Sequence, residues 1–483
     1  MKLFTTAFIL LFMTASAFSQ RALQERLDSL TDAYERKGFH GVVLVAKGEN
    51  VLYEKGYGLA NFDKKIKHTP NTLFKTESVG KMFTAVSILQ LVERGKLRLN
   101  QTIKELVPEL KIKNADKITV HHLLTHTSGM QSPWDSPKWS FKKNFSNKEL
   151  KQLIEEMPLV FDTPGKEMYY SNSGYIVLGW IIEKKTGLAF DQYFQKNIFN
   201  KLAMTHTRHL GDTTMPEAIG AQPYRIISST KYLPMTETLG AQASAAGGWV
   251  STTGDLHKFM AALYANRLLK PKTWELMRTA NGTNPKDSTY RFYAYGLETY
   301  VNEFIAGTSL YGHNGGGAGF NVDAFIDPAT GYIVTSFTNL YQGSRWIMLN
   351  YMRAALDKPI PDFRPFMTAQ VMDLIEQKGI DSFIVNSATY LKQLDIQLHP
   401  GFVAEMGDNF LAIQDYSSWS KWMQFGISTF PNEAFLLLIQ GDGYLQQQNK
   451  AAALKSYEAA RVLATSNNDQ RALRAADEKL KSL

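Results

Sequence analysis

The sequence predicts an α/β (α+β) fold, in which an antiparallel sheet is flanked by helices and carries an inserted, mostly helical region, with an all-helical C-terminal unit after it. Three observations lead to this prediction. Apolar, β-branched runs occur early and again late in the part before Lys358, helical periodicities lie between them, and no strand pattern follows. Strands at both ends of a domain can be neighbours in one antiparallel sheet, which an alternating βαβ order would not predict.

The first segment predicts a secretory signal peptide over residues 1–19. Met1-Lys2 gives a positive start, and the apolar run from Leu3 to Met13 has the length of a signal core. Ala15-Ser16-Ala17 forms an A-x-A cleavage site, with Phe18-Ser19-Gln20 as a second choice. The alternative is an N-terminal membrane anchor, for which this run is too short, and no later stretch is long enough to span a bilayer. We therefore expect a periplasmic or secreted protein without a transmembrane anchor.

Composition narrows the possible chemistry. The 483 residues are 44% hydrophobic and include no cysteine, which excludes a thiol nucleophile, thiolate zinc sites, disulfides and a lipid-modified N-terminal cysteine. The formal net charge of +8 mildly favours carboxylate ligands or acidic surfaces. The basic residues are spread out, however, and their densest runs, at 64–67 and 142–143, are short. We expect no nucleic-acid partner.

The first domain is expected over residues 20–358. It begins with an amphipathic helix, 23–36, and a hairpin of strands at 41–46 and 51–54 around a glycine-containing turn. Helical patterns follow at 78–94, 173–185 and 253–266, and residues 115–158 predict loops and short helices. Strand patterns return at 304–311, 321–326 and 332–338, the last two joined by the turn sequence Asp327-Pro328-Ala329-Thr330-Gly331.

The remaining residues, 359–483, predict a separate helical domain. Gly407 and Phe410 recur as Gly441 and Tyr444, and 441 − 407 = 34, the period of tetratricopeptide repeats. Three further residues fall on the packing positions of that repeat: Ala453, Tyr457 and Ala460. The preceding unit departs from the pattern, because Trp419 stands where a small residue is expected. A tetratricopeptide-like unit would offer a surface for a protein partner, and a generic helical hairpin is the alternative.

A Ser-x-x-Lys motif supplies the candidate nucleophile. The motif starts at four serines, but only Ser78-Val79-Gly80-Lys81 opens a long apolar helix after a hairpin. A spacing of three is nearly one helical turn, so Lys81 projects beside Ser78. Unpaired N–H groups at a helix start can stabilise an oxyanion, and a nearby amine can take the hydroxyl proton. The alternative is an ordinary helix-capping serine with a surface lysine.

Two further motifs stand downstream. Tyr170-Ser171-Asn172 directly precedes a helix, which would hold a phenol and an amide at the site. A phenol has a reference pKa near 10, and a neighbouring ammonium such as that of Lys81 would favour the phenolate and give a base. His313-Asn314-Gly315-Gly316-Gly317 precedes the strand at 321–326, and its glycines allow a substrate to lie close to the backbone.

Together, these motifs resemble those of a clan that contains class C β-lactamases, D-alanyl-D-alanine carboxypeptidases, D-aminopeptidases and β-lactamase-like esterases. Residues 123–129 and 247–252 also look like this clan, and the resemblance covers about residues 23 to 357. It implies a β-lactamase/transpeptidase-like fold and a serine hydrolase without a cofactor or metal. It implies that Ser78 is acylated while Lys81 and Tyr170 handle its proton. It also implies the following binding roles: substrate contacts from Asn172, His313 and Gly315, and an oxyanion hole from the N–H groups of Ser78 and Gly316.

The third motif departs from that of the β-lactamases, which usually have a lysine where this chain has His313. Lysine charge holds the substrate carboxylate, and histidine is similar to the peptidase and D-aminopeptidase variant. We therefore expect cleavage of a D-amino-acid peptide or an ester, and slow cleavage of β-lactams. Lys185-Thr186-Gly187 spells the lysine version, but it lies only 15 residues after Tyr170 (185 − 170 = 15) and is expected to close a helix.

Two other functions fit parts of the sequence. His122 and His126 are four apart and could form a zinc pair, although the glutamate of His-Glu-x-x-His and a third ligand are missing. A non-catalytic, penicillin-binding-like protein that holds a protein partner through its helical tail is the second alternative.

Overall fold

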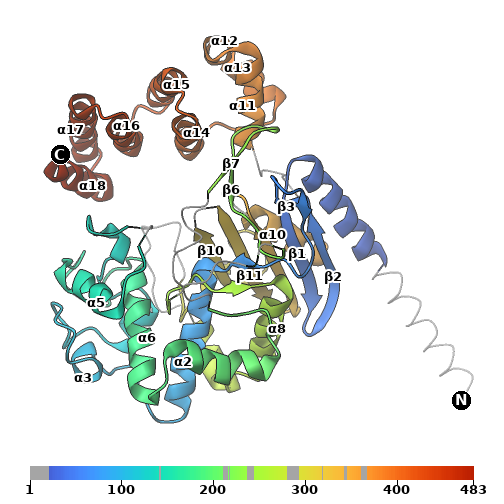
Figure 1. Ribbon diagram of the computed structural model, residues 1–483, viewed down its shortest axis with the longest axis vertical. Coiled ribbons are helices and arrows are strands. Elements are labelled where there is room, and N and C mark those ends of the chain that lie inside the picture. Colours follow the sequence, from blue (N-terminus) through green and yellow to red (C-terminus); the bar gives the residue numbers. More distant parts are fainter. Residues whose placement is uncertain are drawn as a thin grey trace, which may run out of the picture. The chain divides into compact units, whose positions relative to one another are not determined.

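The computed structural model describes residues 21–140, 143–209, 216, 218–235, 244–279, 293–317, 319–341, 345–360 and 367–483 (Figure 1). The predicted signal peptide lies outside these residues and stays a prediction. The chain divides into two compact units. One comprises residues up to 225 together with 234–365, and the other comprises Ile226–Leu233 together with Phe366–Leu483. Ile226–Leu233, which the sequence places in the first domain, thus belongs to the helical unit.

The first unit is built on a six-stranded antiparallel sheet in the order β2-β1-β12-β11-β10-β9. The strands are β1 (Gly41–Lys47), β2 (Asn50–Tyr57), β9 (Glu298–Val301), β10 (Ser309–Gly317), β11 (Phe320–Asp327) and β12 (Tyr332–Thr338). The first and last strands are neighbours, as predicted, with Gly41 opposite Thr338 and Lys47 opposite Tyr332.

Both faces of this sheet are covered. Val42 and Leu44 of β1 belong to the main core, which also contains residues of α2 (Lys81–Glu93) and α8 (Thr253–Tyr264). Val43 and Val45 alternate with them and are equally buried, on the face toward the helix at 21–36 and α10 (Arg345–Ala355). A strand covered on both faces reads as a continuous apolar run, which is why β1 has the sequence Val-Val-Leu-Val-Ala.

Further strands and helices precede β9 in the chain. They are β3 (Leu59–Asn61), β4 (Ile66–Lys67), β5 (Phe74–Lys75), β6 (Tyr224–Ile226), β7 (Tyr232–Pro234), β8 (Val250–Ser251), α3 (Ile103–Leu106), α4 (Val120–Leu124), α5 (Asn147–Glu156), α6 (Asn172–Thr186), α7 (Phe190–Phe194) and α9 (Pro271–Arg278). Helix α6 ends at Gly187, whose φ of 70° caps it in the left-handed region. The prediction that 185–187 closes a helix is therefore confirmed.

Two predicted elements differ from the structure. The strand expected at 304–311 is wrong, because a turn at 302–308 joins β9 to β10 and moves the start of the strand to Ser309. Asn302 and Gly307 adopt positive φ there, and the N–H of Asn302 donates to the carbonyl of Thr308 at 2.8 Å. The glycine-rich motif at 313–317 therefore lies within a strand rather than before one.

The second unit is helical. It contains α11 (Met367–Lys378), α12 (Ile380–Val385), α13 (Ser387–Gln393), α14 (Pro400–Ala412), α15 (Tyr416–Thr429), α16 (Ala434–Gln446), α17 (Lys450–Ser466) and α18 (Gln470–Ser482). Its core includes Ile227 from the segment 226–233, packed in one cluster with Val371 and Trp419. A Cβ on Gly441 would lie 2.2 Å from the ring of Tyr457, so this glycine lets α16 and α17 approach closely.

The predicted repeat explains only part of this packing. Ala453, Tyr457 and Ala460 are fully buried between helices, as its packing positions require. Trp419 is also fully buried, and its ring occupies the space that a side chain on Gly443 would need. The tetratricopeptide assignment stays a prediction. In the described residues, no helix is both long and apolar enough to cross a membrane.

Candidate active site

Ser78 lies on a tight 3₁₀ turn, Glu77–Gly80, that leads directly into α2. Glu77 has a φ of 45°, and the N–H of Thr76 donates to the carbonyl of Trp249 at 2.6 Å. Glycines enclose the turn because nothing larger fits. A Cβ on Gly247 would lie 2.2 Å from the carbonyl oxygen of Glu77. The strained turn thus fixes the Ser78 N–H and hydroxyl at the start of α2.

Lys81 is completely buried and its amine has three close neighbours. The Nζ atom lies 3.0 Å from Ser78 Oγ, 2.7 Å from Asn172 Oδ1 and 2.6 Å from the carbonyl oxygen of Ala246. Burial holds the pKa of Lys81 well below its usual value, although nearby carboxylates oppose this shift. Of the four serines that start a Ser-x-x-Lys motif, Ser78 is the one that lines the cavity among the described residues.

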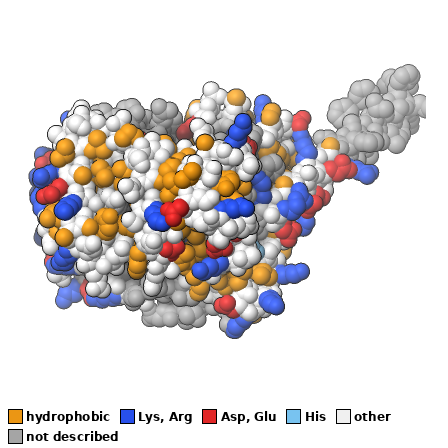
Figure 2. All heavy atoms as spheres, turned by 90° about the horizontal axis from the view of Figure 1, so that it is seen from above, with side chains coloured by type: hydrophobic (Ala, Val, Ile, Leu, Met, Phe, Trp, Pro, Cys, Tyr) orange, Lys and Arg blue, Asp and Glu red, His pale blue; other side chains and the backbone are white. Residues whose placement is uncertain are grey.

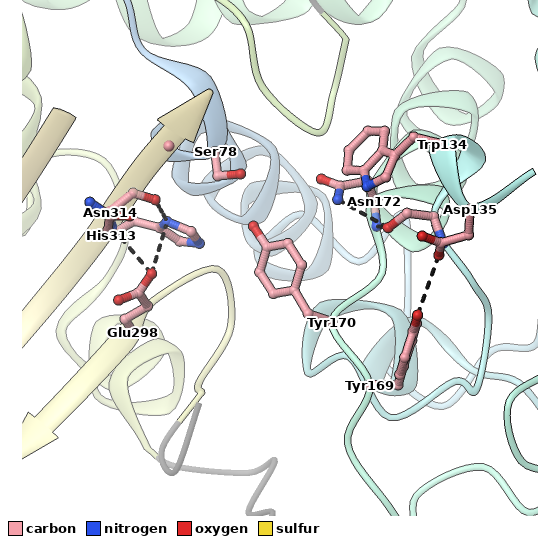
Figure 3. A pocket seen from close by; sticks show the side chains of 11 residues that line it. Ser78, Trp134, Asp135, Tyr169, Tyr170, Asn172, Glu298, His313 and Asn314 are labelled. Atoms are coloured by element: carbon pink, nitrogen blue, oxygen red, sulfur yellow. Dashed lines mark hydrogen bonds and ion pairs between the residues drawn. The ribbon is translucent and has the colours of Figure 1, made fainter. Parts of the chain in front are cut away.

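The Tyr170 motif meets this lysine from the other side. The Lys81 amine lies 4.8 Å from the centre of the Tyr170 ring, and the phenol points toward Ser78 in Figure 3. Ser171 caps α6 through a 3.1 Å bond from the N–H of Gly174. Asn172 begins that helix, and its Nδ2 donates to Ser132 Oγ at 3.1 Å. Its amide is therefore fixed at both ends, by Lys81 and by Ser132.

His313 lies on β10 in the opposite wall of the cavity (Figure 3). It is 1% exposed, its Nε2 lies 2.9 Å from the hydroxyl of Tyr293, and its Nδ1 lies 3.6 Å from Glu298 Oε1. The other carboxylate oxygen of Glu298 pairs with Arg345 at 3.3 Å. Burial lowers the pKa of His313 to about 4, so the ring is neutral at pH 7.

The two glycines of this strand have different surroundings. Gly316 lines the cavity with Ser78, where its N–H can complete an oxyanion hole. Gly315 does not line it, and a Cβ on Gly315 would lie 2.2 Å from the carbonyl oxygen of Thr76. Gly315 therefore brings β10 against the nucleophile turn. Its predicted contact with substrate stays a prediction.

The cavity has a volume of about 360 Å³, and five of its lining residues lie outside the motifs that the sequence predicts to form the site. These are Ser132, Trp134, Asp135, Tyr169 and Glu298, and Asn314 of the third motif also lines the cavity. Asp135 accepts the N–H of Ser132 at 2.8 Å and the Tyr169 hydroxyl at 3.4 Å, and burial raises its pKa. Trp134 is 43% exposed. A Ser-Pro-x-Asp capping pattern and an exposed tryptophan were the available signals for this loop.

The geometry also bears on the zinc alternative. His122 Nδ1 accepts the N–H of Thr119 at 3.2 Å, and His126 Nδ1 accepts that of Ser171 at 3.0 Å. Within the described ranges, no three histidine, aspartate or glutamate side chains gather as a metal site. The Nδ1 atom of each ring therefore accepts a backbone hydrogen bond, and that lone pair is not directed at a metal.

Comparisons with known proteins agree with this arrangement. A family model described as Beta-lactamase matches residues 20–356. PbpX of Bacillus subtilis (strain 168) is 27% identical over 326 residues, which are 68% of this chain and 77% of PbpX. The matches to two further curated relatives cover less of their length: 58% of penicillin-binding protein 4* of Bacillus subtilis (strain 168) and 44% of protein flp of Staphylococcus aureus (strain N315). A penicillin-binding protein homologue from Pyrococcus abyssi, described as octameric, is 25% identical with a TM-score of 0.62, covering 70% of this chain and 78% of its own. D-amino acid amidase from Ochrobactrum anthropi SV3 is 25% identical with a TM-score of 0.57, and the match covers 76% of this chain and 99% of the amidase.

Proposed function

This chain belongs to the beta-lactamase family, and we propose that it is an exported serine hydrolase that forms an acyl-enzyme on Ser78. The observation that carries the proposal is the set of atoms around Lys81 Nζ. Asn172 Oδ1 and the Ala246 carbonyl oxygen can only accept hydrogen bonds. A neutral amine would give its two hydrogens to them and turn its lone pair toward Ser78 Oγ. Lys81 then suits the role of general base.

The reaction follows from this arrangement. Lys81 takes the Ser78 proton while Oγ attacks the substrate carbonyl carbon, and the oxyanion lies between the N–H groups of Ser78 and Gly316. The proton passes through the Lys81–Tyr170 pair to the leaving amine or alcohol as the bond to it breaks. Water then adds to the acyl-enzyme carbonyl and gives a proton to the same pair. The pair passes this proton to Ser78 Oγ as the ester bond breaks, which releases the acid and free Ser78.

The charges around the cavity narrow the substrate. Among the described residues, Asp135 and Glu298 are the acidic ones that line the cavity, no lysine or arginine lines it, and His313 is neutral. A carboxylate on the substrate would meet no cation at the His313 wall, whereas an ammonium would meet Asp135. We therefore favour an amide, peptide or ester of a D-amino acid with a free amino group, and slow acylation by β-lactams. The likeness to a D-amino acid amidase supports this choice.

Export and the helical tail belong to the same proposal. The N-terminal sequence supports delivery to the periplasm or outside the cell, and the relatives include penicillin-binding proteins. We propose that 366–483 forms a tetratricopeptide-like unit that takes no part in the chemistry and serves a protein partner. The buried positions of Ala453, Tyr457 and Ala460 support the repeat.

One experiment tests the catalytic proposal. A fluorophosphonate should label the protein, and mass spectrometry should place the adduct on Ser78. A fluorescent penicillin should label the same serine more slowly. A wild-type protein that reacts with neither reagent would favour the non-catalytic alternative, and an adduct on another serine would remove Ser78 from the site.

A second experiment tests the substrate class. Asp135→Asn should lower kcat/KM for D-phenylalanine p-nitroanilide by about 10- to 100-fold, the value of one hydrogen bond to a charged group. The N-acetylated form of the same compound, which has no ammonium, should be a poor substrate for wild type and unaffected by the substitution. Equal losses on both compounds would mean that Asp135 only supports the loop.

A further inference from the structure

His126 is a buried histidine that the proposed reaction does not use. It follows α4 within 123–129, a stretch that resembles the β-lactamase clan. The residue is fully buried and has a φ of 59°, a left-handed conformation that non-glycine residues rarely adopt. Conformations of this kind persist where the surrounding structure imposes them, often beside active sites.

Three contacts join His126 to three consecutive residues. Its carbonyl oxygen accepts the N–H of Tyr169 at 2.9 Å, and its Nδ1 accepts the N–H of Ser171 at 3.0 Å. Between them, its ring lies against that of Tyr170, with 4.2 Å between ring centres and planes 34° apart. The middle residue is the one whose phenol points toward Ser78 (Figure 3). His126 thus holds the tyrosine loop from both sides of Tyr170.

The imidazole is itself fixed in place. Because Nδ1 accepts a hydrogen bond, the proton of the neutral ring sits on Nε2. That atom is buried without a hydrogen-bond partner among the described residues. The ring also lies 4.4 Å from Tyr293 and 5.1 Å from Tyr175, measured between ring centres. The unused buried donor and the left-handed backbone each cost stability, and the contacts that His126 makes must offset this cost.

We propose that His126 is a positioning residue for Tyr170, which it holds through the acceptor Nδ1 at the N–H of Ser171. The proposal rests on the proposed function, because it gives Tyr170 the part of proton carrier for Ser78. Proton transfer requires the phenol oxygen within hydrogen-bond reach of its partner. A displacement of 1 Å can cost about 10²-fold in rate, and loss of the Ser171 bond removes one of the three contacts by which His126 holds the loop.

Two substitutions with amide side chains test whether the acceptor position at Nδ1 is what matters. Asparagine places its oxygen near the position of Nδ1 and tolerates a left-handed backbone. Glutamine places its oxygen near the position of Nε2 instead. The readout is the second-order rate of Ser78 labelling by a fluorophosphonate, which requires no knowledge of the natural substrate. We expect His126→Asn to label within about threefold of wild type and His126→Gln to lose about 10- to 100-fold.

A double-mutant cycle distinguishes positioning from general support. Tyr170→Phe should itself slow labelling by about 10²- to 10⁴-fold. If His126 acts through Tyr170, His126→Gln should then cost less than about twofold more in the Tyr170→Phe background. The matched control is His122→Gln, because His122 Nδ1 also accepts a backbone N–H but at Thr119, away from Tyr170. It should lower the melting temperature without the loss of rate.

The outcomes separate the inference from its premise. Equal labelling of wild type and Ser78→Ala would overturn the proposed function. Normal Ser78 labelling of wild type together with unchanged labelling of His126→Gln would overturn only the positioning role. The same loss from His126→Gln with and without Tyr170 hydroxyl would also overturn it, since the residue would then support the fold alone.

Discussion

The two walls of the cavity are built from different kinds of structure. The wall with His313 and Glu298 belongs to neighbouring strands, and both side chains are buried (Figure 3). The wall with Trp134 and Asp135 belongs to a short turn, and Trp134 is 43% exposed. A buried strand wall holds its groups in one geometry, whereas a loop wall can change without disturbing the core.

This difference assigns separate tasks to the two walls. On the strand wall, Arg345 pairs with Glu298 and burial keeps His313 neutral, so the described residues of this wall present no unpaired cation to a substrate carboxylate. On the loop wall, Asp135 bonds only to local partners, the N–H of Ser132 and the hydroxyl of Tyr169, among the residues described. Under the proposed function, the strand wall would exclude substrates with a carboxylate, and the loop wall would select substrates with an ammonium. Figure 2 shows basic and acidic side chains interspersed on one face of the molecule, without a single dominant charge.

The largest effect is expected from removal of the nucleophile, Ser78, which lies between the two walls. Ser78→Ala should reduce kcat by about 10⁶-fold, as loss of the nucleophile does in a well-studied serine hydrolase. Turnover of a D-amino-acid p-nitroanilide and labelling by a fluorophosphonate measure this loss. Ser418→Ala is the matched control, since Ser418 also starts a Ser-x-x-Lys motif but lies on α15 of the helical unit. A comparable loss in that control would contradict the assignment.

The next effect comes from giving the strand wall a positive charge. His313→Lys should speed acylation by a fluorescent penicillin by about 10- to 100-fold, because a lysine would offer the β-lactam carboxylate a charged hydrogen bond. Stopped-flow or gel-based labelling gives the rate. His313→Gln keeps the wall neutral and should show no gain. Rapid turnover of a cephalosporin by wild type, on the order of 10² per second, would show that this wall does not exclude carboxylates.

A smaller effect concerns pH. A histidine with an ordinary pKa near 6.5 would become charged as the pH falls from 8 to about 5 and would strengthen carboxylate binding. Burial lowers the pKa of His313 to about 4, so its charge appears only below that pH range. We therefore expect the KM for a penicillin to change less than about twofold across it from this group. A marked fall in KM near pH 6.5 that disappears in His313→Gln would contradict the buried, neutral state.

The same contrast explains what the sequence could predict. Ser78, Lys81, Tyr170 and Asn172 were found because each stands at a helix start that local patterns identify, and the structure brings them together. Glu298 was missed because it meets the His313 strand only through the pairing of β9 with β10, where Glu298 lies opposite Gly312. Such long-range pairing leaves no local signal.

The loop wall and the segment 226–233 of the helical unit were missed for related reasons. Asp135 and Trp134 stand in an irregular stretch whose course is set by tertiary contacts. Ile227 lies far from the tail in sequence yet packs into its core with Val371. A single boundary at residue 358, predicted from composition, cannot assign residues 226–233 to the helical unit, because they lie within the first domain in sequence.

The last prediction tests whether the helical unit contributes to the chemistry at the cavity. A chain that ends at residue 360 should label on Ser78 at a rate within about twofold of wild type, because every described residue that lines the cavity lies before that point. It should nevertheless be less stable or aggregate, since Ile227 would lose the apolar partners that bury it completely. Ile227→Ser in the shortened chain should reduce aggregation without changing the labelling rate, whereas Ile227→Ala in the full chain should destabilise the helical unit by about 2–5 kcal/mol. Differential scanning calorimetry and labelling measure the two properties independently. A shortened chain that keeps its circular dichroism but no longer labels would show that the helical unit contributes to the site.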